Sequence, residues 1–183
     1  MSEAERVHPG ADMPRFVAEQ MAFVGLGDDD AALIRRTAPV VVAHEAELTG
    51  ALYDHFLKFP ESARFFERDD GSPDLERIER RKHSLARWLR ETAQVATAEG
   101  PVYYALGVAL SHSHRGDRPG GRIPPQLMVS AMSLTQSAVA GLLEAELGDP
   151  RLALRAAVAW NKLLLVQLNV LLIGYLLPPA PDR

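Results

Sequence analysis

The chain has 183 residues, of which 47% are hydrophobic and 24% are charged, and its formal net charge is -4. This length suits one domain with a sizeable core, and the acidic balance argues against binding to nucleic acids or anionic membranes, which favours a basic excess. The sequence contains no cysteine, so disulfides and thiolate metal ligands are excluded. The lack of cysteine and of an apolar secretory signal fits a cytoplasmic protein, which we expect.

The N-terminal half is predicted to be helical beyond an irregular start. Three consecutive aspartates, Asp28–Asp30, favour a helix N-terminus because carboxylates accept from free N–H groups and suit the positive end of the dipole. Thr37 followed by Pro39 indicates a restart, since proline is tolerated in a first helical turn. We therefore predict helices over Met13–Phe23, from Asp28 to about Arg36, and from Thr37 to about Phe59.

Proline and glycine divide the C-terminal half into further helices. Leu163–Leu177 is the most apolar stretch, but polar residues interrupt it and it is shorter than the roughly 20 residues that span a bilayer. We expect it to be a buried helix and expect no membrane span. The predicted segments are a short turn over Pro60–Phe66 and helices from Ser72-Pro73 to about Ala96, Gly100-Pro101 to about Ser113, Pro124-Pro125 to about Leu147, and Asp149-Pro150 to about Leu176.

No stretch alternates polar and apolar residues with the period of a strand. The sequence therefore predicts an all-α fold of about eight helices, with Met13–Phe23 as an N-terminal extension helix. We expect one domain over residues 13–177, a flexible N-terminus over 1–12 and a C-terminal tail over 178–183.

Several segments, taken in order, carry a family resemblance. They are Phe23-Val24-Gly25-Leu26-Gly27 with Asp28–Asp30, Ala51 to Leu57 with Pro60-Glu61 and Phe65-Phe66, Ser111-His112-Ser113 before a Gly-rich loop and Ile123-Pro124-Pro125, and Asn161-Lys162-Leu163 through Tyr175. Together they resemble the sensor-globin branch of the globin superfamily, which contains the protoglobins and the globin domains of globin-coupled sensors. The resemblance covers roughly residues 20–176 and implies a globin fold that binds heme b.

Histidine is the expected iron ligand, because globins bind heme iron through a neutral imidazole nitrogen. The resemblance assigns this role to His112, with Val108 and Ala109 on the preceding turn beside the heme. By spacing alone, a helical histidine such as His112 is more often a solvent-exposed or satisfied core residue than a ligand. His114 is the alternative ligand, but residues two apart on a helix point about 200° apart, so both cannot face one iron. His83 is a further candidate for a sixth ligand.

The resemblance places Tyr53 on the ligand side of the heme, where a phenol can donate a hydrogen bond to a bound gas. The alternative is a core tyrosine with its hydroxyl at the surface. Lys82 interrupts an apolar stripe, which indicates either a solvated side chain or a charge at the heme edge. Arg115, Arg118 and Arg122 are candidates to pair the heme propionates, unless their loop is simply solvated. The other expected pocket residues are Leu52, Phe56, Phe66, Ile78, Leu85, Ile123, Leu127 and Met128.

The final helix is apolar on nearly every face from Trp160 to Leu176. A helix that only covers a core needs one apolar stripe, so a second apolar face indicates another partner. The last two predicted helices of two chains could form a four-helix bundle with two-fold symmetry, and the resemblance implies the same homodimer. The alternative is that every apolar face of the final helix is buried in the core of a single chain.

The leading hypothesis is a heme protein that binds a diatomic gas (O2, CO or NO) reversibly, as a gas sensor or sensor domain. Two alternatives remain: a heme-free interaction domain with the globin fold, and a heme protein with redox activity such as NO dioxygenation or peroxidase-like turnover. The sequence contains no phosphate-binding loop, nucleophile elbow or His-Glu-x-x-His motif. An enzyme is therefore the less favoured interpretation.

Overall fold

The computed structural model describes residues 12–95, 100–114 and 121–176. These residues form eight α-helices and one 3-10 helix, and their one β-bridge joins Glu67 and Pro73. The predicted all-α fold with an N-terminal extension helix is confirmed. In chain order the elements are α1 (Met13–Phe23), α2 (Asp28–Ala43), α3 (Glu45–Phe56), α4 (Pro60–Ala63), η3 (Arg64–Phe66), α5 (Leu75–Val95), α6 (Gly100–Ser113), α7 (Pro125–Glu146) and α8 (Pro150–Leu176).

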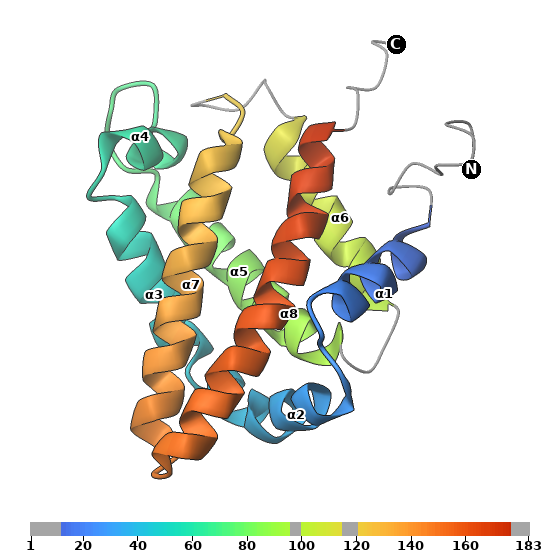
Figure 1. The fold of residues 1–183 in the computed structure, drawn as a ribbon. Helices are drawn as coiled ribbons and strands as arrows, with labels where there is room; N and C mark the ends of the chain where they lie inside the picture. Colours follow the sequence, from blue (N-terminus) through green and yellow to red (C-terminus); the bar gives the residue numbers. More distant parts are fainter. Residues whose placement is uncertain (1–11, 96–99, 115–120, 177–183) are drawn as a thin grey trace, which may run out of the picture.

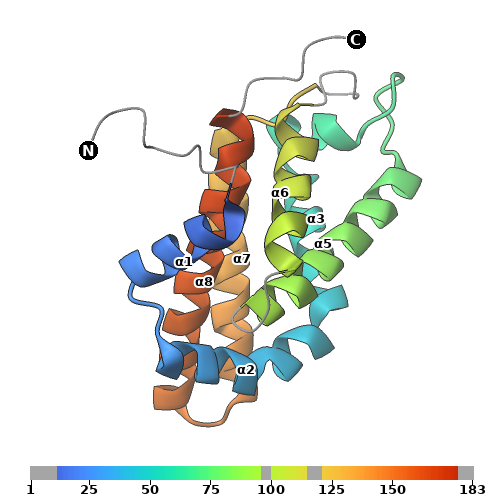
Figure 2. The same ribbon diagram turned by 90° about the vertical axis from the view of Figure 1, so that its right-hand side faces the viewer.

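The two longest helices, α7 and α8, lie side by side in opposite directions and organise the bundle (Figure 1). Helix α6 packs on another side of α8, and α2 crosses one end of the bundle formed by α7 and α8. Figure 2 shows α1 against α8, and α5 beside both α3 and α6. The main core forms around α8, whose Trp160, Leu163 and Leu164 are fully buried.

Helix α2 is longer than the sequence predicted. We expected a restart at Thr37, but α2 runs unbroken through Pro39, and the break before α3 falls at His44. Thr37 is fully buried, donates its hydroxyl to the carbonyl of Leu33 at 2.8 Å and accepts from the indole N–H of Trp160 at 2.9 Å. Its hydroxyl therefore pairs within the core instead of capping a new helix, and that prediction is wrong.

Aspartates mark two other helix starts. The side chain of Asp74 accepts from the backbone N–H of Arg77 at 3.0 Å and caps α5, whereas the hydroxyl of Ser72 bonds Asp70. The N-cap of α5 is therefore Asp74, later than the Ser72 that we predicted. Asp149 starts α8 as predicted, because its carboxylate accepts from the N–H of Arg151 at 2.9 Å. These bonds satisfy N–H groups that have no partner inside the helix.

The extension helix and the turn after it are fixed to α8 by polar contacts. Asn169 donates to the side-chain oxygen of Gln20 at 2.8 Å. Lys162 bonds the carboxylate of Asp30 at 2.6 Å and the carbonyl of Gly25 at 2.8 Å. Gly25 has a φ of +64°, a left-handed conformation that favours glycine and turns the chain from α1 toward α2.

Helices α7 and α8 are long and apolar enough, by length and composition alone, to cross a membrane. In α8, 61% of the apolar window is buried inside the bundle, as in a core helix of a globular domain. This agrees with the buried helix predicted for Leu163–Leu177 up to Leu176, the last described residue. In α7 only 22% of the window is buried, so this helix leaves most of its surface uncovered.

Candidate functional site

His112 lies near the end of α6, and its ring is oriented by the turn before it. The Nδ1 atom lies 2.7 Å from the carbonyl oxygen of Val108, and the Ser111 hydroxyl lies 3.4 Å from the same nitrogen. A carbonyl can only accept, so Nδ1 carries a proton, and in the neutral ring the lone pair then lies on Nε2. The same bond to a carbonyl fixes the tautomer of metal-ligating histidines. The donor set at His112 therefore fits an iron ligand through Nε2.

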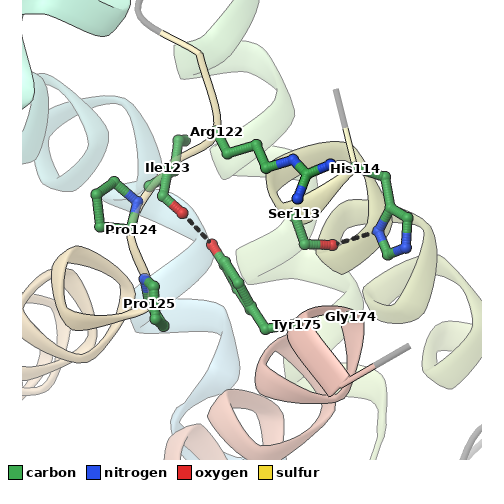
Figure 3. Close-up of a pocket in the computed structure, with 8 residues that line it drawn as sticks. All are labelled: Ser113, His114, Arg122, Ile123, Pro124, Pro125, Gly174 and Tyr175. Atoms are coloured by element: carbon green, nitrogen blue, oxygen red, sulfur yellow. Dashed lines mark hydrogen bonds between the residues drawn. The ribbon is translucent and has the colours of Figure 1, made fainter. Parts of the chain in front are cut away.

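His114, the alternative ligand, has a different environment. Its Nδ1 lies 2.6 Å from the hydroxyl of Ser113, and that hydroxyl also donates to the carbonyl of Ala109 at 3.0 Å. Figure 3 shows His114 at a pocket that includes the last turn of α8, and His112 is not among the residues that line it. The two imidazoles thus have different hydrogen-bond partners, and only that of His114 lines this pocket.

Tyr53 forms the centre of an aromatic cluster between α3 and η3. Its ring centroid lies 5.6 Å from that of Phe56 and 5.3 Å from that of Phe66, both in edge-to-face orientation. Tyr53 is buried, and burial raises the pKa of its phenol well above the ordinary value of 10. The phenol therefore stays protonated at neutral pH and can act as a hydrogen-bond donor.

The charge that acts on Tyr53 comes from Arg81, a residue that we did not single out from the sequence. Arg81 is half-buried on α5, and its positive charge lowers the pKa of the phenol, which offsets a small part of the burial effect. Lys82 instead donates to the carboxylate of Glu79 at 2.9 Å, so its ammonium is held in an ion pair on its own helix. A pocket role for Lys82 remains a prediction.

The two predicted sides of the site lie on elements that make few contacts with each other among the described residues. Helix α6 packs mainly on α8, α5 and α1, and within the described residues neither α3 nor α7 is among its principal partners. Leu52, Tyr53 and Ile78 are buried but stand outside the main core cluster, whereas Ala109 belongs to that cluster and Val108 packs against it. A hydrophobic macrocycle between these two groups would join them into one interior.

The remaining expected pocket residues lie in several environments. Phe56, Phe66, Leu85, Val108, Leu127 and Met128 are half-buried. Ala109 lies where α6 crosses α8, because a Cβ on Gly174 would come within 2.9 Å of its carbonyl and side chain. Ile123 donates its N–H to the carbonyl of His112 at 3.3 Å, so it lies directly beside the candidate ligand. Contact of Ala109 with the heme remains a prediction.

The other histidines and the candidate arginines lie elsewhere. His83 is exposed on α5, and the ring of His55 lies against that of Phe59 at 4.9 Å. His44 bonds the carbonyl of Val40 at 3.0 Å. Within the described residues no group of three or more histidines, cysteines or acidic residues could hold a metal ion. His8, Arg115 and Arg118 lie outside the described residues, whereas Arg122 lies inside them.

Comparisons with known proteins identify the class of this fold. A family model described as protoglobin matches residues 14–177. Among solved structures, the chain is similar to the globin domain of the Geobacter sulfurreducens globin-coupled sensor, with a TM-score of 0.66 and 17% sequence identity over 86% of this chain and 96% of that one. No curated protein sequence matches the chain.

Proposed function

The chain is a member of the protoglobin family, and on this premise we propose that it binds heme b and takes up a diatomic gas (O2, CO or NO) reversibly as a gas sensor or sensor domain. The observation that supports the proposal is the hydrogen bond from His112 to the carbonyl of Val108, because a neutral ring with its proton on Nδ1 would bind a metal through Nε2. When bound, heme iron supplies an open coordination position for the gas.

His112 would hold the iron from the α6 side of the heme. The bond at 2.7 Å to Val108 restricts rotation of the ring and increases the basicity of Nε2, both of which strengthen a metal–imidazole bond. A second bond links the backbone carbonyl of His112 to the N–H of Ile123 and limits movement of the end of α6. His112 would thus be a neutral and well-oriented ligand.

Tyr53 would face the gas from the opposite side. Because its phenol stays protonated, it would donate a hydrogen bond to the gas. Leu52, Ile78 and the rings of Phe56 and Phe66 would surround this donor with apolar surface and keep water away. A dry pocket with one donor favours reversible gas binding over turnover.

The test is an optical spectrum of the purified protein after reconstitution with heme. We expect a Soret band that shifts when CO is added to the reduced protein, and we expect His112→Ala to lose it. His114→Ala is the matched control and should keep both the band and the shift, because His114 faces the pocket beside α8. A colourless reconstituted protein would favour the heme-free interaction domain, and an unchanged spectrum in His112→Ala would remove the ligand assignment.

We also propose a homodimer through α7 and α8, as the sequence suggested. Large apolar side chains are exposed on these helices: Leu154 at 67%, Val129 at 48%, Val158 at 46% and Leu165 at 39%. Three of them, Leu154, Val158 and Leu165, follow one face of α8 at helical spacing. Burying this face against its symmetric copy would form a four-helix bundle. A cytoplasmic location and a single domain over residues 13–177 belong to the same proposal.

A further inference from the structure

A second pocket lies at the end of the bundle where α6 and α8 stop and α7 begins. We call it the terminal pocket. It has a volume of about 260 Å³, and it shares Ile123 with the expected heme pocket, although neither His112 nor Tyr53 lines it. Figure 3 shows its eight lining residues, which are Ser113, His114, Arg122, Ile123, Pro124, Pro125, Gly174 and Tyr175.

The charged side chain that lines the terminal pocket is basic. Arg122 extends toward Ser113 and His114 at the end of α6 (Figure 3), and none of the eight lining residues is acidic. Within the described part of the chain, no carboxylate forms an ion pair with Arg122. A guanidinium carries five N–H donors in a fork that matches the two oxygens of a carboxylate. Among its described lining residues, the pocket therefore offers a positive charge without an acidic neighbour, and a directional set of donors.

The walls of the terminal pocket are apolar and already fixed in place. Ile123, Pro124 and Pro125 form one side. The hydroxyl of Tyr175 donates to the carbonyl of Ile123 at 2.8 Å, which ties this segment to α8. The two prolines restrict the backbone further. A ligand would thus meet a preformed wall and would lose little affinity to ordering the protein.

We propose that the terminal pocket binds a carboxylate, with the guanidinium of Arg122 as its principal donor and the two prolines against the apolar part of the ligand. The carboxylate has two conceivable sources, a free small organic acid or a propionate of the proposed heme. The volume and the walls suit a small acid of about ten heavy atoms. Since Ile123 also bonds the backbone of His112, an occupant would contact the segment that restrains the proposed iron ligand.

The first experiment is calorimetric titration with sodium benzoate, with benzamide as its neutral counterpart. It does not need heme, so it can fail or succeed independently of the proposed function; circular dichroism verifies the fold of each sample. We expect saturable binding of benzoate and none of benzamide, and Arg122→Gln should weaken it about tenfold or more, as expected for loss of a charge-assisted contact. Arg151→Gln removes the same charge at an exposed position and should leave the affinity within about twofold.

The second experiment distinguishes the source of the carboxylate. Heme and its dimethyl ester are titrated into the unmodified chain and into Arg122→Gln. If a propionate is the natural occupant, Arg122→Gln weakens binding of heme about tenfold but leaves the ester unchanged, and bound heme blocks benzoate. If a free acid is the occupant, benzoate binds with or without heme. Benzoate and heme affinities that are both independent of Arg122 would overturn the proposal.

Discussion

The crossing of α6 and α8 predicts an unusual response to a glycine substitution in a helix. At Gly174 an added Cβ would lie 2.8 Å from the carbonyl carbon of Ala109 and 2.9 Å from its Cβ and its oxygen. Two of these atoms belong to backbone, which cannot turn aside as a flexible side chain would. At Gly107, also within a helix of this pair, an added Cβ meets nothing within 4 Å. The same substitution should therefore have opposite effects at the two positions.

The magnitudes follow from two opposing terms. Replacing glycine by alanine inside a helix favours folding by about 0.5–1 kcal/mol. Overpacking a tight contact costs about 1–3 kcal/mol, with the upper part of that range expected when backbone must move. Gly174→Ala should then lose about 1–2 kcal/mol, and Gly107→Ala should gain about 0.5–1 kcal/mol. For a chain of this size each kcal/mol shifts Tm by about 2–4 °C.

Urea and thermal unfolding followed by circular dichroism measure both variants against the unmodified chain, with all samples in the same heme state. The expected result is a lower Tm for Gly174→Ala and a slightly higher one for Gly107→Ala. If Gly174→Ala were as stable as Gly107→Ala, the two helices would not approach as closely as described, and the account of the crossing would be wrong.

Three other predictions test the core, the tyrosines and the dimer. Thr37→Val should lower the free energy of unfolding by about 1–3 kcal/mol because the buried N–H of Trp160 loses its acceptor; denaturant unfolding measures this, and Thr37→Ser should recover most of it. Burial raises the pKa of Tyr175 to about 12 and that of Tyr53 further, so unfolded phenols ionise first and stability should fall as pH rises from about 10 toward 12. The double variant Tyr53→Phe/Tyr175→Phe should flatten that pH profile, and an unchanged profile would contradict the burial of the phenols. Val158→Glu with Leu165→Glu should convert the proposed dimer to a monomer in sedimentation, whereas Leu75→Glu, at a leucine outside α7 and α8 that is more exposed than either, should leave its mass unchanged.

The sequence predicted the helices well where local chemistry decides the boundary. Glycine, proline and capping aspartate act within one turn, so α1, α6 and α8 begin where expected. The error at Thr37 has a different origin. A buried hydrogen bond from Trp160, 123 positions away, uses the hydroxyl that would have capped a helix. A contact over that separation leaves no local signal.

The site was predicted less completely, since helical spacing does not distinguish adjacent positions. Arg81 and Lys82 lie three and four residues after Ile78 and so share its face about equally well. Only the packing of α3 on α5 shows that Arg81 is the residue whose charge reaches Tyr53. The terminal pocket was missed for a related reason. It combines residues from three helix ends, and although His114, Arg122 and Ile123 were each considered from the sequence, no local signal places them together beside Tyr175.

The contact between Ala109 and Gly174 also has a practical consequence. The two helices approach closely at Gly174 and Ala109, one turn before His112. The last turns of α8 and the end of α6 should therefore move together. If the proposed gas binding displaces the imidazole of His112, this close contact would pass the displacement to α8, with little of it absorbed by flexible side chains. A spin label at Leu176, which is exposed, would give a direct readout of that motion in solution.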